Sequence, residues 1–143
     1  MKIYKVFILF LFISSFFSYA QSSQKIILNN LFDQLGKVNN TKSAILLEKK
    51  IWSVWSKHPS DNKLTDRLKF GTELMEYGSY TYALKVFDNI LVTDPKWSEA
   101  WNKRATVYFL MRQYTDSLND IDKVLNLEPR HFGALSGQAR IFI

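Results

Sequence analysis

The most constraining feature of the sequence is an internal repeat of 34 residues. Laying Leu64–Trp97 over Ser98–His131 gives eight identical positions, whereas about two are expected by chance from average composition. A repeat of this length is typical of stacked helical units, each of which buries its apolar face against its neighbours. The identical pairs are Lys69/Lys103, Thr72/Thr106, Tyr80/Tyr114, Thr81/Thr115, Leu84/Leu118, Asp88/Asp122, Leu91/Leu125 and Pro95/Pro129.

Each unit reads as two helices joined by a tight turn. In the first half of the first unit, Leu64, Leu68, Phe70 and Leu74 recur at helical spacing. Gly78 then permits the left-handed conformation that ends many helices. The second half continues with a broad apolar stripe made of Tyr80, Ala83, Leu84, Phe87, Ile90 and Leu91.

The residues between the helices predict where each one starts. We expect Ser79 to cap the second helix of the first unit. Asp94 and Pro95 suit the N-cap and first position of the next helix, so they are predicted to separate the two units. The second unit has Arg112 and Gln113 where the first has Gly78 and Ser79, which predicts a costlier helix stop.

These residues resemble the tetratricopeptide repeat, a helix-turn-helix unit with a skeleton of tryptophan, a small residue, tyrosine, alanine, phenylalanine and proline. Two departures are Arg67 in place of tryptophan and Ser117 in place of alanine. The resemblance implies an all-α fold, an α-solenoid of such repeats preceded by a helical hairpin. The residues assigned to packing within and between repeats are Gly71, Tyr80, Ala83, Phe87, Pro95, Trp101, Ala105, Tyr108, Tyr114, Ser117 and Pro129.

A third unit begins at Phe132, with Leu135, Ala139 and Phe142 on the tryptophan, small and tyrosine positions. The given sequence ends at Ile143, before the second helix of that unit. Either the sequence is a fragment, or this open apolar edge meets a partner, a second copy included. Phe142 is expected to help cover Val124 and Leu125.

The predicted domain organisation is a signal peptide at 1–20, a helical hairpin with linker at 21–62, and a repeat domain at 63–143. The repeat domain comprises units 64–97 and 98–131 and the partial unit 132–143. We expect the hairpin helices near 24–35 and 42–56, with Thr41 as an N-cap; a degenerate repeat is the alternative. Trp52 and Trp55 are predicted to be core residues, and Trp97 to be half exposed.

Residues 1–20 have the pattern of a secretory signal: Lys2 and Lys5, an apolar run of about 12 residues, and a small residue two positions before Ala20. A spanning helix needs roughly 20 residues, so cleavage after Ala20 is favoured over a retained anchor. The remaining chain would carry seventeen basic and thirteen acidic residues and no cysteine. We therefore expect an exported protein, periplasmic or secreted, without disulfides or a cysteine-linked lipid.

No constellation of residues predicts catalysis. His58 and His131 are expected to be solvated loop residues, because neither has a partner at metal-binding helical spacing. Asp116 and Asp120 share a helix face, but Asp116 suits a helix N-terminus and Lys123 could pair with Asp120. We therefore expect no catalytic residue, no metal and no cofactor. No cluster of lysines and arginines predicts nucleic-acid binding. Contact with a membrane is expected only through the signal segment, before its cleavage.

Repeats of this kind stack with their first helices lining a concave face, which implies a protein or peptide partner. The predicted protein-binding groove contains Thr72, Met75, Asn102, Lys103, Thr106 and Phe109. The cationic clamp with which chaperone-binding relatives grip a C-terminal carboxylate is missing, so that activity is not implied. The resemblance implies a non-catalytic scaffold or adaptor of the cell envelope. The alternatives are a helical accessory part of a longer envelope enzyme and a membrane-tethered assembly factor.

Overall fold

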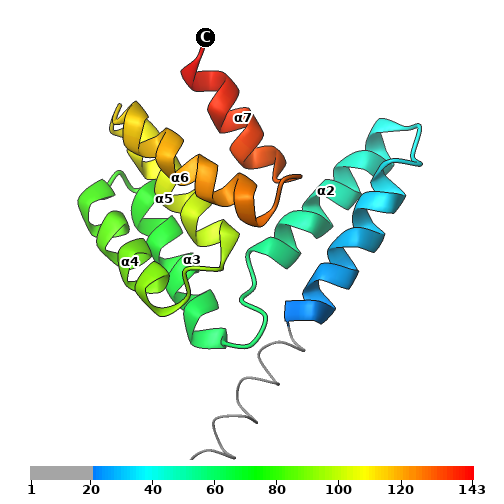
Figure 1. Ribbon diagram of the computed structural model, residues 1–143, viewed down its shortest axis with the longest axis horizontal. Coiled ribbons are helices and arrows are strands. Elements are labelled where there is room, and N and C mark those ends of the chain that lie inside the picture. The colour runs from blue at the N-terminus through cyan, green and yellow to red at the C-terminus, as the bar shows by residue number, and fades with distance from the viewer. Residues whose placement is uncertain (1–20) are drawn as a thin grey trace, which may run out of the picture. The chain divides into compact units, whose positions relative to one another are not determined.

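The computed structural model describes residues 21–143, and the predicted signal segment at 1–20 lies outside them. The chain divides into two compact units, with the division between Asn62 and Lys63. Every regular element in the described residues is a helix (Figure 1). The prediction of an all-helical fold, consistent with an array of helix-turn-helix repeats, is confirmed.

The first unit is a helical hairpin. A helix runs through 21–35, a turn follows, and α2 spans Thr41–Trp55. Trp55 is buried and lies against Phe32 and Trp52, with ring centroids 5.9 and 5.5 Å away. Trp52 itself is half-buried. Gln24 ties the open end of the hairpin by donating to the carbonyls of Val54 and Lys57 at 2.8 Å each.

Two expectations for this unit are wrong. Asn40, not Thr41, is the N-cap of α2: its side chain accepts from the backbone N–H of Ser43 at 2.9 Å. His58 is buried rather than solvated. Its Nδ1 accepts from the N–H groups of Ser60 and Asp61 at 3.3 and 3.0 Å, so the ring folds onto the turn that it stabilises.

The second unit holds five helices (Figure 1). They are α3 (Asn62–Glu76), α4 (Tyr80–Thr93), α5 (Ser98–Leu110), α6 (Tyr114–Leu127) and α7 (Phe132–Ile141). The first repeat consists of α3 and α4, the second consists of α5 and α6, and α7 is the first helix of the third unit. The first helices of successive repeats are therefore α3, α5 and α7.

The turns inside the two repeats have the same backbone geometry. Gly78 has φ 75° and Arg112 has φ 61°. In each turn the following N–H, from Ser79 or Gln113, reaches back to a carbonyl of the first helix at 2.8 Å. This is the Schellman arrangement. It confirms Gly78 as the predicted stop. Arg112 takes the same left-handed conformation although it has a Cβ, and the prediction of a costlier stop corresponds to about 1–2 kcal/mol of strain.

Helix starts were predicted less well. Ser79 stands at the N-cap of α4, but its side chain makes no capping bond. Asp94 does not cap α5: it follows α4, and its carboxylate accepts from the Lys96 N–H at 2.8 Å to form a turn. α5 begins only at Ser98, after Trp97. Trp97 precedes the helix and is buried, with an exposed fraction of 5%. The expectation of half exposure is therefore wrong.

The close approach of paired helices depends on small residues. Gly71 of α3 faces Phe87 of α4, where an added Cβ would lie 2.6 Å from the ring. In the second repeat the hydroxyl of Ser117 donates to the carbonyl of Ala105 at 2.9 Å. The departure from alanine at Ser117 thus adds a hydrogen bond between α5 and α6.

Several predicted contacts are replaced by others. Phe70 is exposed because it lies on the outer face of α3. Phe142 is 73% exposed and does not cover Val124; Ala134 and Ile141 pack there instead. Pro95, Tyr114 and Pro129, which were assigned to repeat packing, have exposed positions, but the Tyr114 ring still lies against Phe109, with ring centroids 5.8 Å apart.

Asp120 pairs with Arg104 rather than with Lys123. Two hydrogen bonds of 2.8 Å join the guanidinium to Asp120 on α6, and a third of 2.7 Å reaches Asp88 on α4. Burial raises the pKa of the Asp120 carboxyl, and the bonds from Arg104 oppose that rise. Through these bonds one side chain of α5 connects both neighbouring helices. The Arg104 guanidinium also lies over the ring of Trp101 on its own helix.

Two helical glycines allow a matched test of this packing. Gly71→Ala should destabilise the protein by about 1–3 kcal/mol, because the new methyl group overpacks the fully buried Phe87 ring. Gly137→Ala should be neutral or stabilising by up to about 1 kcal/mol, since its Cβ would meet Ile121 at an ordinary 3.5 Å. Urea denaturation of both variants measures the difference, and equal shifts would contradict the proposed close approach.

Candidate functional site

A pocket of about 180 Å³ lies between the first helices of the second and third units. α5 contributes Asn102, Thr106 and Phe109 to its lining, which are three of the six predicted groove residues. Lys103 is half-buried on α5 outside this lining. Thr72 and Met75 are half-buried on α3 and do not reach the pocket.

The opposite wall of the pocket is open because α7 carries small residues there. The lining residues of α7 are Gly133, Ala134, Ser136, Gly137 and Arg140, and Ala105, Ser117 and Ile121 complete the lining. The side chain of Arg140 is exposed, and within the described chain it makes no ion pair. The pocket lining therefore combines apolar contacts from Ala105, Phe109 and Ile121 with polar side chains and one exposed cation. Sequence reasoning had not selected Arg140 or the small residues of α7.

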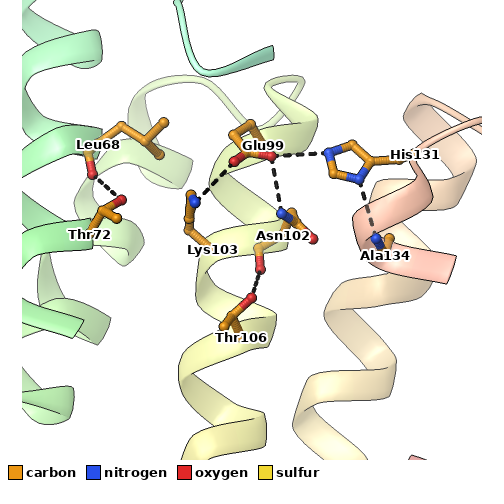
Figure 2. A network of polar contacts seen from close by, with 8 residues as sticks. All are labelled: Leu68, Thr72, Glu99, Asn102, Lys103, Thr106, His131 and Ala134. Carbon is orange, nitrogen blue, oxygen red and sulfur yellow. Dashed lines mark hydrogen bonds and ion pairs between the residues drawn. The ribbon is translucent and has the colours of Figure 1, made fainter. Parts of the chain in front are cut away.

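Figure 2 shows a buried polar network that includes Asn102 and Ala134, two residues that also line the pocket. At its centre is Glu99 in the first turn of α5, whose side chain is fully buried. Glu99 Oε2 lies 3.0 Å from His131 Nε2 and accepts from Asn102 Nδ2 at 3.1 Å. Its other oxygen, Oε1, lies 3.4 Å from Lys103 Nζ. The carboxylate thus lies near one lysine and contacts the side chains of Asn102 and His131.

His131 connects this network to α7. The expectation that it would be solvated is wrong: its exposed fraction is 0%. It is the N-cap of α7, and its Nδ1 accepts from the Ala134 N–H at 3.3 Å. Because Nδ1 accepts, the neutral ring must carry its proton on Nε2, where it donates to Glu99. One side chain therefore caps α7 and connects it to α5 beside the pocket.

The network determines how Asn102 faces the pocket. A carboxylate only accepts hydrogen bonds, so the amide nitrogen of Asn102 must face Glu99. Its amide oxygen then points away from Glu99, as Figure 2 shows. Asn102 is 6% exposed and lines the pocket. The sequence had indicated Asn102 as a binding residue, but not the buried pair that orients it.

The first repeat has apolar residues at two of the three equivalent positions. A shift of 34 residues places Leu68 over Asn102, Trp97 over His131, and Thr65 over Glu99. Leu68 and Trp97 are 2% and 5% exposed and belong to one apolar core cluster. One polar contact is the same in both repeats: Thr72 and Thr106 each donate to the carbonyl four residues earlier at 2.8 Å (Figure 2).

The chemistry of this site is recognition through hydrogen bonds and shape. Glu99 and His131 are a potential acid–base pair, but their burial keeps both from direct contact with a substrate. Within residues 21–143 no group of three or more His, Cys, Asp and Glu residues is placed to bind a metal. No helix of that same range is both long and apolar enough to cross a membrane.

Comparison with known proteins agrees with the fold. The chain is 37% identical over 122 residues to a TPR repeat-containing protein of Rhizobium etli. The chain is a homologue of a tetratricopeptide-repeat protein. The match covers 85% of this chain and 59% of the relative, so the chain spans only part of the relative's length. No family model matches the sequence.

The Glu99–His131 pair can be tested by a double-mutant cycle. His131→Leu should destabilise the protein by about 3–5 kcal/mol, because it removes a partner of a buried carboxylate and uncaps α7. In a Glu99→Gln background no buried charge remains, so the same substitution should be less damaging by about 0.5–3 kcal/mol. Urea denaturation of the four proteins gives both values. Equal losses in the two backgrounds would show that the residues are not coupled.

Proposed function

We propose that this chain is a non-catalytic protein–protein interaction module, a scaffold or adaptor that binds an extended protein or peptide segment between α5 and α7. The observation that supports the proposal most directly is the pocket between two successive first helices of the repeat array. It presents a mostly neutral lining, a buried and oriented amide at Asn102, and a cation at Arg140. These features suit a peptide ligand that has both apolar and polar groups.

The groove can be tested by filling it. Peptides selected from a random display library against the full chain should bind at least tenfold more weakly to Gly137→Leu, because the added side chain occupies the pocket. Ala139→Leu is the matched control: it adds the same side chain to an exposed position of α7 outside the pocket lining. Fluorescence polarisation gives the affinities, and thermal melts check that both variants remain folded. Equal affinities for the two variants would contradict binding in this groove.

We also propose that the protein is exported to the cell envelope or secreted. The support is the sequence pattern of residues 1–20, which predicts cleavage after Ala20. The protein recovered from its own cells should therefore begin at Gln21, which intact-mass analysis with N-terminal sequencing determines. An N-terminus that retains residues 1–20 would contradict cleavage and favour the membrane-tethered alternative.

One observation favours a second candidate function. The chain spans only 59% of its relative's length, so the repeats could be the helical accessory part of a longer envelope enzyme or assembly factor. The genomic reading frame distinguishes the candidates. A frame that continues past Ile143 into a catalytic domain would favour the second candidate.

A further inference from the structure

We propose that the pocket selects an extended acidic segment. One large apolar side chain of the ligand fills the pocket, and the backbone N–H of that same residue donates to Asn102 Oδ1. An Asp or Glu side chain two or three residues away pairs with Arg140. This inference rests on the proposed function and deepens it by naming the class of ligand. Glu99 and His131 act as positioning residues for Asn102.

The hydrogen-bond requirement comes from Asn102. Its side chain is more than nine-tenths buried, its nitrogen is committed to Glu99, and its oxygen has no hydrogen-bond partner among the described residues. A ligand that covers this oxygen without donating to it would leave a desolvated acceptor unpaired, which is unfavourable. The ligand must therefore carry a donor at this point, and every non-proline residue of an extended chain has a backbone N–H to supply it.

The size of the pocket limits what enters it. A cavity of about 150 Å³ lined by apolar side chains can hold benzene. The volume here is about 180 Å³, which suits one side chain of leucine or phenylalanine size. The lining by Ala105, Phe109, Ile121, Ala134 and Gly137 offers apolar contact to that side chain.

Charge complementarity sets the third requirement. Arg140 is an exposed cation on the pocket lining and makes no ion pair within the described chain. The nearby cation Lys103 is engaged by the buried Glu99 instead. Arg140 is therefore the lining residue that can attract an anionic group, and guanidinium–carboxylate pairing is its preferred geometry.

The spacing along the helices separates the two polar contacts. On α7, Gly133 and Arg140 are seven residues apart, which is about 10 Å of helix at 1.5 Å per residue. Gly133 lines the same pocket as Asn102. An extended ligand advances about 3.3 Å per residue, so 10 Å corresponds to about three residues. If the Arg140 side chain extends toward Asn102, the carboxylate lies closer and the separation is about two residues. The N–H and the carboxylate thus belong to different residues of one segment.

The repeat comparison supports a local specificity site. The equivalent site between α3 and α5 is found by a shift of 34 residues. Leu68 then stands in place of Asn102, and Thr106 stands in place of Arg140. Leu68 is buried in the apolar core and offers no acceptor. The combination of an oriented acceptor and a free cation therefore occurs at this one place in the described repeats.

The test uses capped decapeptides in an alanine–serine background, each with one leucine and one glutamate separated by one to four positions. Fluorescence polarisation with the full chain should show the tightest binding at separations of two or three. Arg140→Gln should weaken that peptide at least tenfold, and Arg67→Gln, which removes an equal charge from an exposed position on α3, should not. The difference should shrink at high salt. Loss of the spacing preference, or equal effects of the two variants, would overturn the proposal.

A second measurement isolates Asn102. Methylation of the ligand's backbone nitrogens one at a time should abolish binding at one position, the nitrogen of the leucine. The same scan with Asn102→Ala should show no position-specific loss, because the acceptor is gone. Glu99→Gln should blunt the position-specific loss, because a glutamine can either donate or accept and no longer fixes the amide. An unchanged scan with Asn102→Ala would overturn the role of this residue.

The outcomes also separate this inference from the proposed function. Display-selected peptides that lose affinity for Gly137→Leu, but contain no acidic residue and are insensitive to Arg140→Gln, would overturn the inference and keep the groove. A neutral peptide that gains affinity only from a free C-terminal carboxylate would show that Arg140 reads a chain end, which contradicts the proposed side-chain recognition. Peptides indifferent to Gly137→Leu would contradict the proposed function itself.

Discussion

The repeat domain depends on how closely the two helices of each repeat can approach. Gly71 leaves room for the Phe87 ring, and Ala105 leaves room for Ser117, whose hydroxyl then bonds to the Ala105 carbonyl. Because protein interiors are close-packed, a distance fixed at these contacts determines the positions of the neighbouring helices as well. The cluster of Ala105, Ile121, Val124 and Ala134 then joins α5, α6 and α7. This packing contributes to the spacing of α5 and α7, and so to the pocket between them.

Much of the repeat architecture could be predicted from the sequence because it depends on local patterns. A 34-residue period, apolar residues at helical spacing and Gly78 were sufficient to locate the helices and the turn inside the first repeat. Arg112 was recognised as an expensive stop by its alignment with Gly78, and it does adopt a left-handed φ of 61°. Three groove residues, Asn102, Thr106 and Phe109, could be placed on one helix face in the same way.

The connections between repeats were predicted poorly, and for one physical reason. Trp97 and His131 precede a helix in equivalent positions, where a loop residue is normally assigned to solvent. In this stack the chain turns inward before α5 and α7, so both side chains are buried. The partner of His131 is Glu99, 32 residues earlier, and no local pattern indicates that contact. Arg140 was missed because its role depends on how α7 lies against α5.

The first repeat has apolar residues where the second repeat has a buried polar network, and this difference suggests what the network does. Leu68 and Trp97 fill the first site with apolar surface, which needs no compensating hydrogen bonds. Burying Glu99 and His131 is a poorer source of stability, since desolvation of a charge offsets much of the gain from pairing it. A buried ionic group is better suited to fixing one geometry than to adding stability. Here the fixed geometry is that of Asn102, whose amide could otherwise rotate and present either a donor or an acceptor. The buried pair thus converts an ambiguous side chain into a defined acceptor at the edge of the pocket.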